Sequence, residues 1–373
     1  MLEQFAKQMD HCTACPRLCQ SACPVGMAEA NETHTSWGLM QTMNMVRKGE
    51  LEFNDETAKL SYHCLTCKAC TSQCDHEIDV AAVMQEVRRL AVLEDKAPKE
   101  LAGYLSKFHR HNNPFSRDLL AKLKDIIPQS YFAMDTKQVY FASCTTISKS
   151  PEVIKDTFEL FEKLKINFVG AYPEPIQCCG YPLYSGGHID EFIDLAEVNY
   201  NTLKKYKTII SGSPTCVYTL KELYKKYDMN LSSKVVSINQ FIAPYLNNIN
   251  YKIRKNIRTK LMYHDPCYLS RYLGEIDLPR DMLSLVSGYE PLEFYNHGEK
   301  SGCSGQGGCY SIVNQEASNE IAQKRLEEVS ERNVHLLVTQ CPSCIHKFRK
   351  NSQRLIVKDV ISYINDCIDG AEF

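Results

Sequence analysis

The spacing of apolar residues along the chain changes near residue 138 and separates two kinds of secondary structure. Before that point, apolar residues recur three and four positions apart, which is the period of a helix with one buried face. Asp79 can cap the first turn of one such helix. The apolar face of that helix consists of Val80, Val83, Val87 and Leu90. We therefore predict a mostly helical first part that ends near residue 93.

From residue 138 onward, short β-type runs alternate with helical patterns. Residues 139–142 form the first run, and Ser150 followed by Pro151 is a favoured start for the helix behind it. Further β-type runs lie at residues 166–169, 208–210, 261–263 and 336–338. This alternation predicts parallel sheets covered by helices. Residues 94–137 form a helical and polar connector before them.

Charge and hydropathy narrow the class of protein. The 373 residues carry a formal net charge of −2 without a concentrated basic stretch, which argues against nucleic acid as a partner. The N-terminal residues lack the apolar run of a signal peptide, and the sequence lacks a run of about 18 apolar residues that could cross a membrane. We therefore expect a cytoplasmic protein that meets a membrane at most peripherally, through a partner.

The chain contains 18 cysteines, and most of them stand at short spacings that suit metal ligands. A disulfide framework is the alternative, but such frameworks belong mainly to short secreted chains. We interpret the cysteines as ligands of metals or of iron–sulfur clusters.

Two cysteine runs near the N-terminus predict a pair of 4Fe–4S clusters. One run has the spacing C-x2-C-x2-C-x3-C, and the other is one residue longer and precedes Pro24. In such pairs the fourth cysteine of each run ligates the other cluster. One predicted ligand set is Cys12, Cys15, Cys19 and Cys74, and the other is Cys64, Cys67, Cys70 and Cys23. Zinc also accepts four thiolates, but two such runs and a following proline favour clusters.

A second cysteine pattern occurs twice in the α/β part of the chain. Corresponding cysteines are offset by 123 residues (Cys144 to Cys267), and later pairs by 125 and 128 residues, which indicates a duplicated unit. The predicted metal ligands of the first unit are Cys144, Cys178, Cys179 and Cys216. Those of the second unit are Cys267, Cys303, Cys341 and Cys344.

These motifs, with Cys178-Cys179-Gly180 and residues 263–269 as the most specific, resemble iron–sulfur oxidoreductases that carry two cysteine-rich CCG domains behind a two-cluster ferredoxin domain. Such proteins include heterodisulfide reductase catalytic subunits, the glycolate oxidase iron–sulfur subunit and the small subunit of anaerobic glycerol-3-phosphate dehydrogenase. The resemblance implies an α+β multidomain protein. Its segments would be an α-helical ferredoxin domain (1–93), the connector (94–137) and two α/β cysteine-rich domains (138–250 and 251–373).

The sequence departs from that family pattern at two positions. The pattern has five thiolates in each unit, which can hold a non-cubane cluster, but Ser213 and Ser304 stand where cysteines are expected. A serine hydroxyl is a poorer iron ligand than a thiolate. Four thiolates still suffice for a cubane 4Fe–4S cluster or for zinc in either unit. His264 and Asp265 flank Cys267 and are candidates for a catalytic proton relay.

The resemblance implies an electron-transfer subunit of an oxidoreductase that needs a partner. The sequence contains neither a G-x-G-x-x-G nor a P-loop motif, so we expect no flavin or NAD on this chain and place hydride chemistry on another subunit. A flavoprotein dehydrogenase acting on a 2-hydroxy acid, or another redox subunit, is the expected partner. One alternative is a heterodisulfide reductase-like catalytic subunit, and a second is a zinc-stabilised docking scaffold. His63, His109 and His111 lack matched ligands and are interpreted as structural or exposed.

Overall fold

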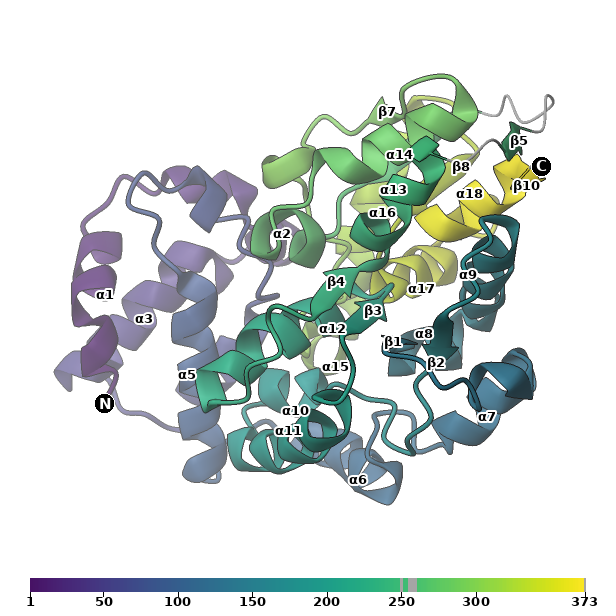
Figure 1. Ribbon diagram of the computed structural model, residues 1–373. Coiled ribbons are helices and arrows are strands. Elements are labelled where there is room, and N and C mark those ends of the chain that lie inside the picture. The colour runs from purple at the N-terminus through teal and green to yellow at the C-terminus, as the bar shows by residue number, and fades with distance from the viewer. Residues whose placement is uncertain (249–250, 254–259, 372–373) are drawn as a thin grey trace.

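Helices dominate the N-terminal part of this computed structural model, which describes residues 1–248, 251–253 and 260–371 (Figure 1). The helices are α1 (Ala6–Thr13), α2 (Pro24–Glu29), α3 (Ser36–Lys48), α4 (Asp55–Leu60) and α5 (Val80–Leu93). The side chain of Asp79 accepts a hydrogen bond from Ala82 N at 3.1 Å and so caps α5, as predicted. Val80, Val83 and Val87 are buried against α3 and α1, which confirms the predicted apolar face.

The connector contains α6 (Ala102–His111) and α7 (Leu119–Ile126). Both helices pack their apolar residues onto the first of two four-stranded sheets, since Phe108, Leu119 and Leu123 belong to its core cluster. None of the helices in the described part of the chain combines the length and apolarity that a membrane span requires.

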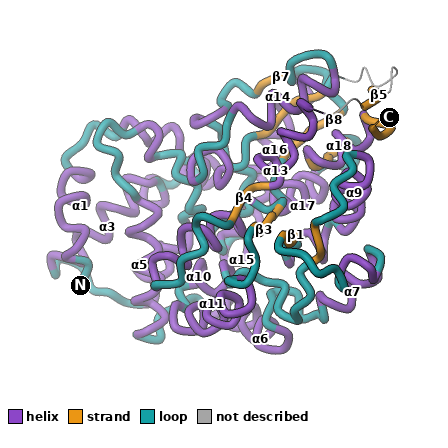
Figure 2. Tube along the Cα trace, viewed as in Figure 1, coloured by secondary structure: helices purple, strands orange, loops and turns teal. Residues whose placement is uncertain are grey.

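The first sheet has the strand order β2-β1-β3-β4, and all of its neighbouring strands are parallel. Its strands are β1 (Gln138–Tyr140), β2 (Val169–Ala171), β3 (Thr208–Ser211) and β4 (Val235–Ser237). Its helices are α8 (Cys144–Lys149), α9 (Pro151–Lys163), α10 (Tyr181–Gly186), α11 (Ile189–Leu203), α12 (Pro214–Tyr218) and α13 (Ile238–Asn248). Figure 2 shows these helices around the strands.

The second sheet repeats this topology with the order β7-β6-β8-β9, again parallel throughout. Its strands are β6 (Leu261–His264), β7 (Leu292–Glu293), β8 (Leu336–Thr339) and β9 (Ile356–Asp359). Its helices are α14 (Asp277–Ser287), α15 (Tyr310–Val313), α16 (Gln315–Glu331), α17 (Pro342–Asn351) and α18 (Val360–Cys367). A short antiparallel pair joins β5 (Tyr251–Ile253) and β10 (Ile368–Ala371). The predicted boundary between residues 250 and 251 lies partly outside the described residues.

The equal topology of the two sheets confirms the predicted α/β duplication, and one strand differs from its predicted position. Residues 166–169 were expected as a strand, but β2 starts at Val169. The preceding residues instead close α9: Lys165 has φ 56°, Ile166 N donates to Phe161 O at 2.8 Å, and Ile166 is buried. This is a Schellman-type helix end, in which an apolar residue after the turn packs back on the helix.

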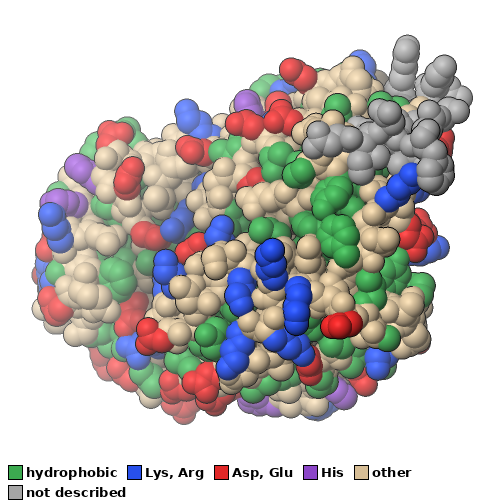
Figure 3. Space-filling view, in the orientation of Figure 1, with side chains coloured by type: hydrophobic (Ala, Val, Ile, Leu, Met, Phe, Trp, Pro, Cys, Tyr) green, Lys and Arg blue, Asp and Glu red, His purple; other side chains and the backbone are tan. Residues whose placement is uncertain are grey.

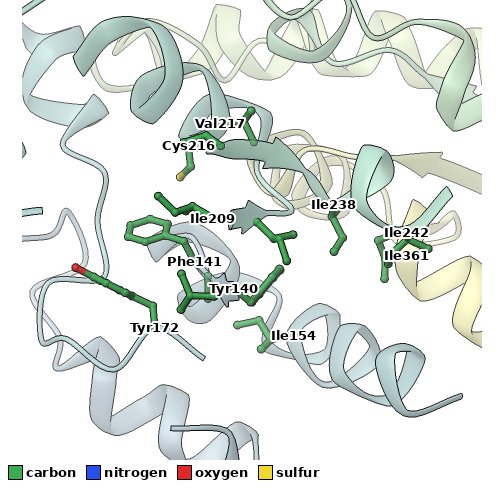
Figure 4. Packing of buried hydrophobic residues seen from close by; sticks show 14 of the residues in the cluster. Tyr140, Phe141, Ile154, Tyr172, Ile209, Cys216, Val217, Ile238, Ile242 and Ile361 are labelled. Carbon is green, nitrogen blue, oxygen red and sulfur yellow. The ribbon is translucent and has the colours of Figure 1, made fainter. Parts of the chain in front are cut away.

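The two sheet units share part of their core. Ile154 of α9, Ile242 of α13 and Ile361 of α18 belong to one buried cluster (Figure 4). Because α18 follows the second sheet in sequence but packs on α9 of the first, the two units are held together by apolar contacts. On the face seen in Figure 3, charged side chains of both signs are scattered among polar and hydrophobic ones.

Candidate metal centres

The first group of predicted ligands comes from the end of α1, the turn after it and the loop before α5. Burial, together with the charges of Cys19, Cys15 and Cys74, raises the pKa of the Cys12 thiol to about 12. The four thiols therefore lie within electrostatic reach of one another, in the combination that the crossed pattern predicts. Two donors point at this group: Arg17 N lies 3.2 Å from Cys15 Sγ, and Ser36 Oγ lies 3.4 Å from Cys19 Sγ.

The second group of thiols lies where a tight loop meets the start of α2. Burial, together with the charges of Cys67 and Cys23, raises the pKa of the Cys64 thiol to about 12. Burial raises the pKa of the Cys70 thiol, and the charges of Cys67, Cys64 and Cys23 add to this rise. Cys19 of the first group raises this pKa as well. The two groups are therefore neighbours, as expected of a cluster pair.

A buried arginine supports the loop that carries the second group. Arg88 of α5 donates to the carbonyl oxygens of Ser61 at 2.8 Å and Cys64 at 2.6 Å. Thr66 and Lys68 have φ values of 51° and 58°, so the loop curls tightly. Thr66 N donates to Cys64 Sγ at 3.3 Å, which places one backbone dipole on a predicted cluster ligand.

The cysteines of the first cysteine-rich unit gather at the carboxyl ends of β1 and β3. This edge is where open parallel sheets usually bind ligands. Hydrogen bonds from Cys178 and Cys216 lower the pKa of Cys179 well below its ordinary value. Cys144 in turn lies beside Cys178 and raises the pKa of its thiol. The four predicted ligands therefore form one contiguous set of free thiols. Tyr224 OH holds the Cys179 carbonyl at 3.0 Å.

The second unit places its cysteines at the equivalent edge, at the ends of β6 and β8. All four are free thiols. Cys267 raises the pKa of the Cys303 thiol, and Cys341 and Cys267 both raise the pKa of the Cys344 thiol. Ser304, which replaces the expected cysteine, donates from Oγ to Cys344 Sγ at 3.2 Å. In the first unit Ser213 likewise bonds to Cys216. Both serines thus face a thiol of their own set.

One thiol contact joins the N-terminal cysteines to the second unit. Cys67 and Cys303 belong to one buried cluster, close enough for Cys303 to raise the pKa of the Cys67 thiol. Arg271 fixes this junction, because its Nε donates to the Cys67 carbonyl at 2.5 Å and its Nη1 to the Ser301 carbonyl at 2.7 Å. Tyr272 OH adds a bond to Thr66 O at 2.7 Å.

A glycine-rich loop makes this close approach possible. A Cβ atom at Gly307 would lie 2.3 Å from Leu65 O, and one at Gly308 would lie 2.3 Å from Cys64 O. Both distances are far inside van der Waals contact, so only glycine fits there. The loop therefore lets the second unit lie directly on the cluster-binding turn.

The two cysteine-rich sets face a single cavity of about 280 Å³. The cysteines that line it are Cys144, Cys179, Cys216, Cys267, Cys303, Cys341 and Cys344, together with Cys309. Cys309 was not anticipated, because it belongs to no spaced motif. It has φ 64°, its thiol lies 3.7 Å from Ser185 Oγ, and burial raises its pKa. The preceding glycines are the one sequence signal that could have marked this loop.

The two candidate catalytic residues have different surroundings. His264 lines the cavity, is 1% exposed, and has no hydrogen-bond partner on either ring nitrogen among the described residues. Burial lowers its pKa well below the ordinary value. Asp265 instead forms a bidentate pair with Arg280 at 2.7 and 2.8 Å and accepts from Gly298 N. Its contacts support the fold of the loop rather than the cavity.

The thiol sets fit the groups that the sequence predicts for them. Each set offers four sulfur donors, and backbone or hydroxyl donors point at several of the sulfurs, as is usual around iron–sulfur clusters. Since Ser213 and Ser304 are within hydrogen-bonding distance of a thiol, each cysteine-rich set has four sulfurs and one hydroxyl close by.

Comparison with known proteins agrees with these features. A family model described as a 4Fe-4S dicluster domain matches residues 8–78. A model described as a cysteine-rich (CCG) domain matches twice, at residues 138–221 and 261–349.

Curated relatives align with most of the chain. One subunit of the fumarate reductase (CoM/CoB) of Methanothermobacter marburgensis is 26% identical, with 91% of this chain and 68% of that protein covered. One subunit of the dihydromethanophenazine:CoB–CoM heterodisulfide reductase of Methanosarcina barkeri is 25% identical, with 85% and 79% covered. Lactate utilization protein A of Oceanobacillus iheyensis is 27% identical, with 62% and 97% covered. The chain therefore belongs to the CCG-domain iron–sulfur family, with a 4Fe-4S dicluster domain before two cysteine-rich domains.

Proposed function

We propose that this chain relays electrons between a flavoprotein dehydrogenase and a further acceptor, and that the dehydrogenase acts on a 2-hydroxy acid or a similar small substrate. The observation that carries this proposal is the direct contact between the turn around Cys67 and the second cysteine-rich unit: Arg271 Nε donates to the Cys67 carbonyl at 2.5 Å, and Cys67 and Cys303 belong to one buried cluster. It makes the N-terminal thiol groups and the cysteine-rich sets one continuous series. Electron transfer between buried centres requires such proximity, because its rate falls steeply with distance.

The four thiol sets would hold the centres of this relay. The ligand sets are Cys12, Cys15, Cys19 and Cys74; Cys23, Cys64, Cys67 and Cys70; Cys144, Cys178, Cys179 and Cys216; and Cys267, Cys303, Cys341 and Cys344. When bound, a 4Fe–4S cluster accepts and donates one electron. Donors from the chain, such as Thr66 N at 3.3 Å from Cys64 Sγ and Gly305 N at 3.4 Å from Cys303 Sγ, would stabilise the reduced form.

The relatives support a role as a subunit rather than as a complete enzyme. Two of them are named as subunits of a fumarate reductase and of a heterodisulfide reductase, and a third is named for lactate utilization. Lactate is a 2-hydroxy acid, which is the substrate class proposed for the partner of this chain.

The test is anaerobic purification of the tagged chain from its native cells, followed by flavin analysis and addition of lactate or glycolate. We expect a flavoprotein to co-purify and the iron–sulfur absorption to bleach when the hydroxy acid is added. Co-purification with a partner that lacks flavin, or clusters that stay oxidised with every hydroxy acid, would contradict the proposal.

A second candidate function is reductive cleavage of a small disulfide, which is favoured by the shared cavity. Two sulfur-rich sets that line one cavity can receive the two sulfur atoms of one substrate. The reaction consumes two electrons and two protons and yields two thiols. Assay with a reduced viologen dye and a small disulfide separates the two functions, because a relay alone leaves the disulfide intact.

A zinc-stabilised docking scaffold is the remaining alternative for the cysteine-rich domains. Metal analysis of the anaerobically purified protein tests it, since about eight iron atoms belong to the dicluster domain alone. Iron in excess of that number assigns clusters to the cysteine-rich domains. Zinc in its place would remove both redox functions from that half of the chain.

A further inference from the structure

Three side chains outside the cysteine sets converge at one point beside the second thiol group. Glu29 is the last residue of α2, His34 ends a 3-10 turn (Glu32–His34), and His63 ends another turn (Ser61–His63) directly before Cys64. One ligand-type atom of each residue lies within 4.8 Å of the other two. The sequence alone left His63 without a matched partner, and the fold supplies two.

Both imidazoles present the same nitrogen to the carboxylate. His63 Nδ1 lies 3.0 Å from Glu29 Oε1 and 3.2 Å from Oε2, and His34 Nδ1 contacts Oε2. The two rings lie 4.0 Å apart between centroids and are tilted by 32°. The two Nδ1 atoms and the carboxylate therefore point into one small volume.

The carboxylate is oriented from its other side by the second cysteine-rich unit. Tyr310 OH and Asn314 Nδ2, the latter at 3.0 Å, both donate to Glu29 Oε1. These bonds fix Oε1, which also lies 3.0 Å from His63 Nδ1, while Oε2 lies beside both histidines. Carboxylates that bind metals are commonly held in this way by hydrogen bonds to the oxygen that does not ligate.

The site is shielded but reachable from solvent. The side chains of Glu29, His63 and His34 are 8%, 11% and 18% exposed. An ion could enter without unfolding the domain, and water could complete its coordination.

We propose that Glu29, His34 and His63 bind one divalent transition-metal ion of the zinc type. Two imidazoles and one carboxylate are a donor set that Zn²⁺ accepts in tetrahedral sites with one further position open. The set contains no thiolate, which distinguishes it from every cysteine set described above. This site is separate from the relay and does not depend on the proposed function.

Such an ion would link three pieces of the structure. Cys23 precedes the start of α2, which ends at Glu29, and Cys64 follows His63 in the chain. Tyr310 and Asn314 attach the carboxylate to α15 and α16. The ion would therefore hold the end of α2 and the turn before Cys64 against the second cysteine-rich unit.

The experiment uses the whole chain loaded with its clusters and first treated with a mild chelator to remove loosely bound metal. Zn²⁺ binding is then measured by equilibrium dialysis under anaerobic conditions. The variant is His34→Gln, and its matched control is His109→Gln, whose imidazole pairs with Glu191 on the surface at 2.6 Å. We expect one zinc ion per chain in the parent and in the control, and at least tenfold weaker binding in the variant. Iron and sulfide contents show whether the clusters are equal in all three.

Two further measurements separate this site from the alternatives. Zinc-edge X-ray absorption should show a nitrogen and oxygen shell at about 2.0–2.1 Å, whereas a sulfur shell at about 2.3 Å would place the ion on vacant cysteines and overturn the proposal. Tyr310→Phe keeps all three ligands but removes one donor to Glu29, and should weaken zinc binding by about 10- to 100-fold. A parent chain that takes up no zinc would show that the three residues form a hydrogen-bonded cluster only.

Discussion

Ser304 Oγ donates a hydrogen bond to Cys344 Sγ at 3.2 Å, at the position where the family pattern leads us to expect a cysteine. In the first unit Cys179 and burial raise the pKa of Cys216, and the neighbouring Ser213 opposes that rise. The replacement therefore keeps a polar group at the edge of each set but changes it from a sulfur ligand to a hydrogen-bond donor.

Removal of this donor should lower the reduction potential of a cluster held by the second set. Ser304→Ala leaves the Cys344 sulfur without the bond, and a loss of about 1 kcal/mol corresponds to roughly 40 mV for a one-electron couple. Redox titration followed by EPR measures the shift. Ser311→Ala, which also lines the cavity but bonds to Gln306, is the control and should leave the potential unchanged.

Ser304→Cys combined with Ser213→Cys tests whether four thiolates limit the chemistry of the cavity. We expect the parent to show no non-cubane EPR signal and to reduce small disulfides slowly or not at all. The double variant should gain such a signal, because a fifth thiolate becomes available in each set. A parent that already shows the signal and reduces a disulfide at a useful rate would contradict this expectation.

Cys74→Ser should damage the cluster that uses Cys12 rather than the one that uses its sequence neighbours. The reason is that Cys74 lies within electrostatic reach of Cys12 and Cys19. Iron analysis and EPR of the reduced protein should show a loss of about four iron atoms from one cluster. Cys70→Ser is the comparison and should affect the other cluster. An identical EPR change in both variants would be evidence against crossed ligand sets.

Gly308→Ala should destabilise the junction between the cluster-binding turn and the second unit. Gly308 has φ +63°, and an added Cβ would lie 2.3 Å from Cys64 O. Gly274→Ala is a matched control, because Gly274 has φ +67° but nothing within 4 Å of the added atom. The control carries only the left-handed backbone cost of about 1–2 kcal/mol. Thermal unfolding of the cluster-loaded protein should show a clearly larger loss for Gly308→Ala, and equal losses would mean that the contact has no energetic weight.

The buried carboxyl of Asp359 should make the protein less stable as the pH rises from about 4 to about 8. Burial raises the pKa of this carboxyl to about 8, whereas in the unfolded chain it titrates near 3.8. The folded state therefore binds a proton that the unfolded state has lost, and this contribution to stability disappears as the pH passes the folded-state value. In the protein, Ile361 N donates a hydrogen bond to Asp359 Oδ1 at 2.9 Å. The variant Asp359→Asn keeps a side-chain oxygen that can accept this bond. The pH dependence of thermal unfolding should be flatter in the variant, and parallel curves would contradict the assignment.

The spacing of residues in the sequence was sufficient to predict features that depend on residues close together in the chain. The run from Cys64 to Cys74 and the helix capped by Asp79 are of this kind, and the positions of β1, β3, β6 and β8 followed from short apolar runs. The strand expected at residues 166–169 shows the limit even there. A buried Ile166 serves a helix end as well as a strand, and periodicity over four residues does not separate the two.

The sequence by itself determined the duplication and predicted the cysteine sets, because a repeat offset and ligand spacing are properties of the chain. Only the tertiary structure decided that Cys67 and Cys303 lie in one buried cluster, that both cysteine-rich sets open on one cavity, and that Cys309 lies in its wall. It also decided that Glu29, His34 and His63 meet. These contacts join residues far apart in sequence, up to 236 positions for Cys67 and Cys303. They depend on how three packed units dock, which apolar burial and backbone fit determine and which no local pattern records.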